Sequence, residues 1–157
     1  MIKEKQHRLS FNIYEGFVTV SFTICIKDRV SIFTSADIVN LFGEALVAEA
    51  ASFDCDVPIY LFMPDHLHVI LKGTSDTAHP LKAINQFKQK TGYWLSKNDA
   101  HVQWQKGYYD HIIRMEEDLT KHIRYVLDNP IREGIVANWI DYPFKGSATL
   151  NLDSEPF

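Results

Sequence analysis

The segment from Met63 to Leu71 places two histidines, His66 and His68, in a short alternating run that is rich in Val, Ile and Leu. Such a run predicts a β-strand, in which successive side chains point to opposite faces. His66 and His68 would then share one face, while Leu67 points into the core. Two imidazoles about 7 Å apart along a strand can bind one divalent metal ion. The segment therefore predicts both a half-buried strand and part of a metal site.

The pattern along the rest of the chain predicts an α+β fold. Apolar periodicity and turn residues predict strands over residues 16–25, 57–63, 67–72 and 108–114, and helices over 35–51, 80–97 and about 118–129, the last ending before Pro130. The order strand, helix, strand, strand, helix, strand, followed by a helix, is that of the ferredoxin-like, split βαβ fold. We therefore expect a central antiparallel sheet with helices on one side. Residues 1–157 contain no repeat or linker, so we expect a single domain.

The composition is that of an ordinary globular protein, with 46% apolar and 23% charged residues. No apolar run approaches the roughly 18 residues of a membrane-spanning helix, and residues 1–5 lack the apolar core of a signal peptide. We therefore expect a cytoplasmic protein with no membrane partner. Cys25 and Cys55 fall in or beside expected strands, which favours two buried thiols over a disulfide.

The charge distribution bears on nucleic-acid binding. A formal net charge of −4 disfavours such binding, because phosphate contacts need Lys and Arg. Between residues 82 and 109, however, only Asp99 opposes a local excess of lysines, which are Lys82, Lys88, Lys90, Lys97 and Lys106. This excess predicts either a basic surface on an acidic protein or an ordinary solvated helix face.

A second pair of polar residues lies at the end of the last expected helix. Tyr125 and Asn129 are four residues apart, about one helical turn, so we expect them to share a face. The amide oxygen of Asn129 suits Mg²⁺ or Mn²⁺ as a third ligand beside the histidines, although a residue before Pro130 is equally suited to cap the helix. Tyr125 is either a nucleophile for phosphorus, if a metal polarises the phosphate, or a core aromatic residue. Taken with the histidines, the nucleophile is the favoured interpretation.

Three blocks of the sequence resemble one known family. The segment 63–68, which contains the two histidines, resembles the histidine–hydrophobe–histidine signature of HUH endonucleases. Residues 104–111 (WQKGYYDH) and 125–134 (YVLDNPIREG) resemble single-tyrosine insertion-sequence transposases, and among them the REP-associated tyrosine transposases of bacteria. The blocks occur in the family's order, and the resemblance runs over residues 16–147, the expected core of the domain.

The resemblance implies a ferredoxin-like sheet that presents His66 and His68 to Mg²⁺ or Mn²⁺, with Asn129 as a third ligand. It also implies that Tyr125 cleaves single-stranded DNA to a 5′-phosphotyrosine and a free 3′-hydroxyl, after which a 3′-hydroxyl can displace the tyrosine and rejoin DNA. The expected partner is single-stranded or hairpin DNA, bound by a monomer or a homodimer. Expected DNA contacts are Lys82, Lys88, Lys90 and Lys97, together with N-terminal Lys3, Lys5 and Arg8.

Two other functions fit the same residues. A hairpin-binding protein without catalysis would keep the fold and lack turnover. A metal-dependent phosphodiester hydrolase that uses water would keep the histidines and need a carboxylate base, for which Asp65 and Asp110 are available. Lys121, His111 and His122 can assist proton transfer or bind phosphate, and the sequence does not rank them.

Overall fold

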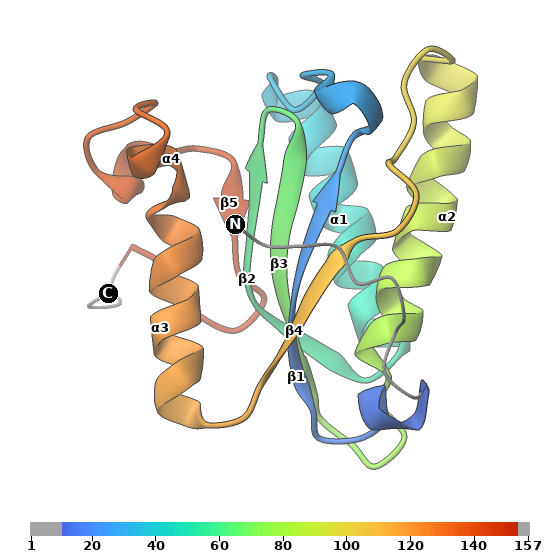
Figure 1. Cartoon of the computed structure of the whole chain (residues 1–157), viewed down its shortest axis with the longest axis vertical. Helices are drawn as coiled ribbons and strands as arrows, with labels where there is room; N and C mark the ends of the chain where they lie inside the picture. The colour runs from blue at the N-terminus through green and yellow to red at the C-terminus, as the bar shows by residue number, and fades with distance from the viewer. Residues whose placement is uncertain (1–10, 154–157) are drawn as a thin grey trace.

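The chain forms one β-sheet with helices packed against it (Figure 1). The computed structural model describes residues 11–153. Its strands are β1 (Thr19–Cys25), β2 (Cys55–Met63), β3 (His66–Gly73), β4 (Tyr109–Ile113) and β5 (Lys145–Gly146). Its α-helices are α1 (Ala36–Ser52), α2 (Pro80–Asn98), α3 (Glu116–Leu127) and α4 (Asn129–Arg132). Short 3₁₀ turns lie at η1 (Phe11–Tyr14), η2 (Lys27–Arg29) and η3 (Trp139–Asp141).

The sheet confirms the expected α+β fold. Its strand order is β4-β1-β3-β2-β5, and every paired strand is antiparallel to its neighbour. Two helical crossovers, α1 between β1 and β2 and α2 between β3 and β4, give the split βαβ arrangement. β3 therefore lies at the centre of the sheet and carries both histidines. The short β5 was not expected, and it extends the sheet beside β2.

Helices cover both faces of the sheet. The expectation of helices on one side holds for α1 and α2, the pair that belongs to the split βαβ unit, and α3 lies on the opposite face (Figure 1). The reason is that α3 is itself amphipathic and needs an apolar surface to cover. Its buried residues Ile123, Val126 and Leu127 pack on Ile59, Leu61 and Ile70 of the sheet. The core on the other face includes Val20, Phe22, Ile24, Leu67, Val69 and Leu71, with Phe42, Leu46, Ile84 and Phe87 of α1 and α2.

Strand register brings polar residues together on the α3 face. His68 lies opposite Thr23 on one side and Leu61 on the other, and Thr23 lies opposite Tyr109. Paired residues of neighbouring antiparallel strands point to the same face, so these residues form one row across the sheet. The next row on that face, two residues further along each strand, contains Ile59, Ile70, Ser21 and His111.

The chain after α3 turns where proline requires it. α3 ends at Leu127 with Asp128 at its C-cap, and Pro130 lies in the first turn of α4, where a missing amide hydrogen is tolerated. The following segment packs Trp139, Tyr142 and Phe144 against the α3-side core. Both cysteines are buried free thiols. Among the described residues, no helix combines the length and the hydropathy needed to cross a membrane.

Candidate functional site

His66 and His68 project side by side from β3 on the α3 face. Their Nε2 atoms are 3.1 Å apart, and their rings are almost perpendicular, at 86°. The alternation of the strand explains this shared face, and it also buries Leu67 in the core on the other face. The expected pair is therefore present, and its two Nε2 atoms turn toward each other.

Each imidazole is held through its other ring nitrogen. His68 Nδ1 lies 3.1 Å from Thr23 Oγ1, and His66 Nδ1 lies 2.6 Å from Asp65 Oδ1. Arg29 Nε donates to the second oxygen of Asp65 at 2.9 Å. Outer contacts of this kind orient an imidazole and decide which ring nitrogen faces a ligand. Both histidines are thereby arranged to present Nε2.

Asn129 reaches the same place from the start of α4. Its side-chain amide contacts Nε2 of His68, and the residue is 7% exposed. Because Asp128 occupies the C-cap of α3, the alternative in which Asn129 caps that helix is wrong. Within residues 11–153, no three His, Cys, Asp or Glu side chains are grouped to hold a metal ion. A metal bound by this pair of histidines would therefore need an amide or water as its third ligand.

Burial controls the charge of these groups. Burial, together with the smaller effects of the charges of His66, Arg132 and Arg29, lowers the pKa of His68 to about 3. Burial also lowers the pKa of His66, against the opposing hydrogen bond and charge of Asp65. Burial raises the pKa of Asp65, but the hydrogen bonds from His66 and Arg29 prevail, so that its pKa lies below the usual value. Neutral imidazoles and an ionised carboxylate are the forms that favour metal binding.

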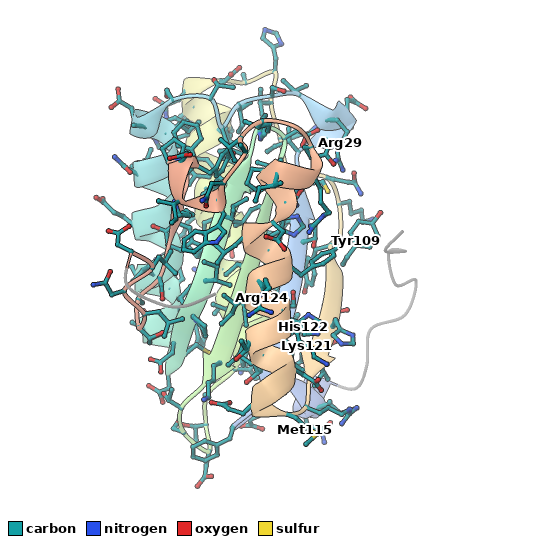
Figure 2. All side chains as sticks on the ribbon, turned by 90° about the vertical axis from the view of Figure 1, so that its left-hand side faces the viewer. Arg29, Tyr109, Met115, Lys121, His122 and Arg124 are labelled. Carbon is teal, nitrogen blue, oxygen red and sulfur yellow. The ribbon has the colours of Figure 1, made fainter. Side chains whose placement is uncertain are left out.

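A pocket of about 450 Å³ opens beside His68, between α3 and the sheet. His68 and Tyr125 both line it, so two expected site residues from distant parts of the chain meet there. Tyr125 is 52% exposed, and the alternative of a core aromatic residue is therefore wrong. The other lining residues are Ser21, Thr23, Tyr109, Asp110, His111, Lys121, His122 and Val126. Figure 2 shows Tyr109, Lys121 and His122 on the side of α3 that faces β4.

Arg132 holds the exposed ring of Tyr125. Its guanidinium carbon lies 4.0 Å from the ring centroid, and its Nη2 donates to the backbone oxygen of Tyr125 at 2.9 Å. A cation over an aromatic face attracts it electrostatically, and the second contact fixes the direction of the guanidinium. The two contacts together restrict the orientation of the tyrosine side chain.

The lysines expected to contact DNA lie on α2, across the sheet from the pocket (Figure 1). Lys88 donates to two carbonyl oxygens of the segment before β4, at 3.0 and 2.9 Å, and Lys90 pairs with the buried Glu49 of α1. Both therefore contribute to the packing of α2. Lys82 and Lys97 are exposed, and Lys97 lies over the ring of Tyr93. The other expected contacts, Lys3, Lys5 and Arg8, lie outside the described residues.

Three residues of the site are missing from the sequence-based expectation. Thr23 belongs to another strand, and only strand register reveals that it faces His68. Arg29 follows β1 in a turn where its φ is +55°, and no local pattern connects it with Asp65. Arg132 did carry a signal, because it lies seven residues, or two helical turns, after Tyr125.

Comparisons with known proteins identify the family of the chain. Residues 17–129 match the family model described as transposase IS200-like. A REP-associated tyrosine transposase of Escherichia coli K12 is 25% identical over 126 residues, which cover 78% of this chain and 72% of that protein. A Haemophilus influenzae protein predicted to be a REP-associated tyrosine transposase is 25% identical over 134 residues, which cover 78% of this chain and 76% of that protein.

The fold has a solved counterpart. The structure of a REP-associated tyrosine transposase bound to a REP hairpin matches with a TM-score of 0.74 at 20% identity, covering 90% of this chain and 81% of that one. At this identity the match establishes the shared fold. The family model extends from the residues before β1 to Asn129, and so includes every element that lines the pocket. The chain belongs to the IS200-like transposase family, which confirms the resemblance found in its sequence.

The neutral, buried His68 should make the stability of the metal-free protein depend on pH. The unfolded chain titrates His68 near 6.5, whereas the folded chain does so at about 3. Between these values only the unfolded state binds the proton, so stability is complete above about pH 6.5 and falls as the pH is lowered toward 3, by at most about 1.4 kcal/mol per pH unit. Urea denaturation in EDTA between pH 4.5 and 7.5 measures this slope. His68→Gln should reduce the slope and exposed His101→Gln should not; equal slopes in the two variants would contradict the assignment.

Proposed function

We propose that this chain is a metal-dependent transposase that cleaves and rejoins single-stranded DNA through Tyr125. One observation carries the proposal: Tyr125 and His68, which lie 57 positions apart in the sequence, line one pocket, and Nε2 of His68 contacts both His66 and Asn129. A nucleophile and a set of metal-binding donors are the two parts that such a reaction needs. Membership of the IS200-like family independently supports this reaction class.

The donor set fits a divalent metal ion. His66 and His68 present Nε2 atoms 3.1 Å apart, each with its Nδ1 held by a hydrogen-bonding partner. Asn129 adds an amide beside His68, and rotation of that amide by half a turn exchanges its nitrogen for its oxygen. Imidazole nitrogen and amide oxygen together suit Mn²⁺, and the oxygen also suits Mg²⁺. Bound there, the ion would polarise the scissile phosphate and stabilise the charge of the transition state.

Tyr125 supplies the nucleophile in this proposal. Its phenolic oxygen forms a bond to phosphorus while the bond from phosphorus to the 3′ oxygen breaks, and the 3′ oxygen takes up a proton as the phenol loses one. The products are a 5′-phosphotyrosine and a free 3′-hydroxyl. Arg132 holds the tyrosine ring, which lowers the entropy lost in reaching an in-line geometry. Because the tyrosine ester conserves the phosphodiester bond energy, a 3′-hydroxyl can displace the tyrosine and rejoin the strand.

The contacts of the two acidic candidates favour tyrosine over water as the nucleophile. A hydrolase needs a carboxylate that is available to accept a proton from water. Asp65 is engaged by both Arg29 and His66, which holds it in the ionised form. Asp110 is buried and accepts a hydrogen bond from Tyr14 at 2.5 Å. Both carboxylates already have structural partners, whereas Tyr125 is exposed at the pocket.

The proposed substrate is hairpin DNA with a single-stranded flank. A REP-associated tyrosine transposase of the same fold has been solved with a REP hairpin bound. The single strand is the part that can enter a pocket of this size and bring its backbone to Tyr125, and the duplex of the hairpin would lie outside it. We infer that Lys82 and Lys97 contribute to duplex contacts, since both side chains are exposed on α2.

The first test concerns the nucleophile. Tyr125→Phe removes the phenolic oxygen and keeps the ring on Arg132, so it should abolish the covalent adduct with a flanked hairpin while leaving binding within a few-fold. The measurement is adduct formation on denaturing gels, with anisotropy for binding. Tyr109→Phe, in the same pocket, is the matched control and should still form the adduct. Loss of the adduct in Tyr109→Phe alone would show that the wrong tyrosine was chosen.

The second test concerns the metal. His66→Ala and His68→Ala should each abolish Mn²⁺ binding measured by calorimetry, and cleavage should stop in EDTA. Asp65→Asn should weaken Mn²⁺ binding by roughly 10- to 100-fold, because it removes the charge that orients His66. Asp76→Asn, an exposed loop substitution, is the control. Cleavage undiminished in EDTA, or unchanged Mn²⁺ affinity in both histidine variants, would exclude this site.

The third test concerns the DNA. The protein should bind a flanked hairpin more tightly than a blunt duplex of equal length, and affinity should fall as salt rises because bound lysines release counterions. Replacing both Lys82 and Lys97 by Ala should lower the slope of log affinity against log salt by roughly one unit per lost phosphate contact. Anisotropy titrations at several salt concentrations measure both. Equal affinity for the two DNAs would refute the substrate, and an unchanged slope would refute the lysine contacts.

A further inference from the structure

The pocket continues past Tyr125 to a pair of histidines that the proposed chemistry does not use. His111 comes from β4 and His122 from α3, and both line the pocket. Their rings are stacked, with centroids 5.1 Å apart and planes at 27°. His111 lies in the row next to the one that contains His68, two residues away along the strands, a step of about 7 Å. The stacked pair is thus displaced from the metal-binding cluster along the same pocket.

The stacked pair sits in a mainly basic and polar environment. Lys121 of α3 lines the pocket beside His122, and the hydroxyl of Ser21 of β1 faces the same space. The acidic groups nearby are Asp118 on α3, which favours protonation of His122, and Asp110 on β4, whose carboxylate is hydrogen-bonded to Tyr14. Tyr109 of β4 also lines the pocket, in the row that contains His68. Among the described residues that line the pocket, the acidic one is Asp110, and its carboxylate already accepts a hydrogen bond from Tyr14.

The two imidazoles oppose each other's protonation. Burial lowers the pKa of His122, and the charge of His111 lowers it further. A second positive charge at a ring separation of 5.1 Å is unfavourable because like charges repel. An anion held against both rings would remove this penalty and accept a charge-assisted hydrogen bond from each.

We propose that His111, His122 and Lys121 form a phosphate-binding subsite for the single strand, next to the position of the scissile phosphate. The ligand is a backbone phosphodiester of single-stranded DNA. Holding this neighbouring phosphate fixes the direction in which the strand passes Tyr125, which a single contact at the scissile phosphate cannot do. The subsite rests on the function proposed above, because it lies in the pocket that contains Tyr125.

The subsite makes strand binding depend on pH. Phosphodiester binding favours protonated imidazoles, so we expect affinity to be high at low pH and to be lost as the pH rises. Lys121 adds a contact that does not pass through the imidazoles, so we expect it to contribute whichever form they take. We therefore expect the affinity for single-stranded DNA to have a pH-dependent contribution from the two histidines and a pH-independent contribution from Lys121.

Binding of a labelled oligothymidylate, measured by anisotropy in EDTA at pH 6 and pH 8, tests this division of roles. The unmodified chain should bind several-fold more tightly at pH 6, and the double variant His111→Gln, His122→Gln should lose most of that gain. Lys121→Gln should weaken binding at both pH values and lower the salt slope by roughly 0.7, the value for one phosphate contact with a single strand. His101→Gln, an exposed histidine outside the pocket, is the matched control.

Nuclear magnetic resonance of the imidazoles supplies a second readout. Oligothymidylate should raise the pKa values of His111 and His122, whereas thymidine, which has no phosphate, should leave them unchanged. A pH gain that persists in the double variant, or imidazole pKa values that do not move at saturating oligonucleotide, would overturn the subsite. Tyr125→Phe separates the two proposals: the subsite predicts that this variant keeps the pH-dependent binding. Failure of the unmodified chain to form an adduct would instead count against the nucleophile alone.

Discussion

The antiparallel register of β1 and β3 is the constraint on which the rest of the site depends. It places Thr23 opposite His68 and Cys25 opposite His66. A shift of one residue would turn both histidines into the α1 and α2 core and expose Leu67 in their place. The burial of Leu67, Val69 and Leu71 therefore fixes the position of the histidines. The register that places these apolar side chains in the core places His66 and His68 on the α3 face. The stability of the core and the geometry of the site are properties of the same strand.

Burial of the histidines costs free energy unless their polar atoms are paired. Thr23, Asp65 and Asn129 provide those partners, and Arg29 in turn balances the charge of Asp65. The chain of contacts runs from an exposed guanidinium to a buried imidazole. Such an arrangement holds the Nε2 atoms in place before a ligand arrives, so that little ordering remains when one binds. Tyr125, the proposed nucleophile, differs from the histidines because its side chain is exposed and its ring is held by Arg132.

The parts of the fold that follow from local pattern were predictable, and those that follow from packing were not. The β3 alternation identified the shared face of His66 and His68, and the order of elements identified the ferredoxin-like sheet. The face chosen by α3 was not predictable, because an amphipathic helix can cover either face equally well. Arg29 and Thr23 were likewise hidden, since each meets its partner only after β1 and β3 have paired. The helical offset of Tyr125 and Asn129 predicted a shared face, but one side chain is exposed and the other is buried, because α3 ends at Leu127 and Asn129 begins α4.

The layering also limits how DNA can reach the protein. α2 and its lysines lie on one side of the sheet, and the pocket with Tyr125 lies on the other (Figure 1). β4 is an edge strand, and it connects the two sides because it follows α2 in the chain and lines the pocket through Tyr109 and His111. A DNA that contacted both α2 and Tyr125 would have to pass around this edge. The stacked histidines lie on the pocket side of that edge, where a strand coming around β4 would meet His111 and His122 beside Tyr125.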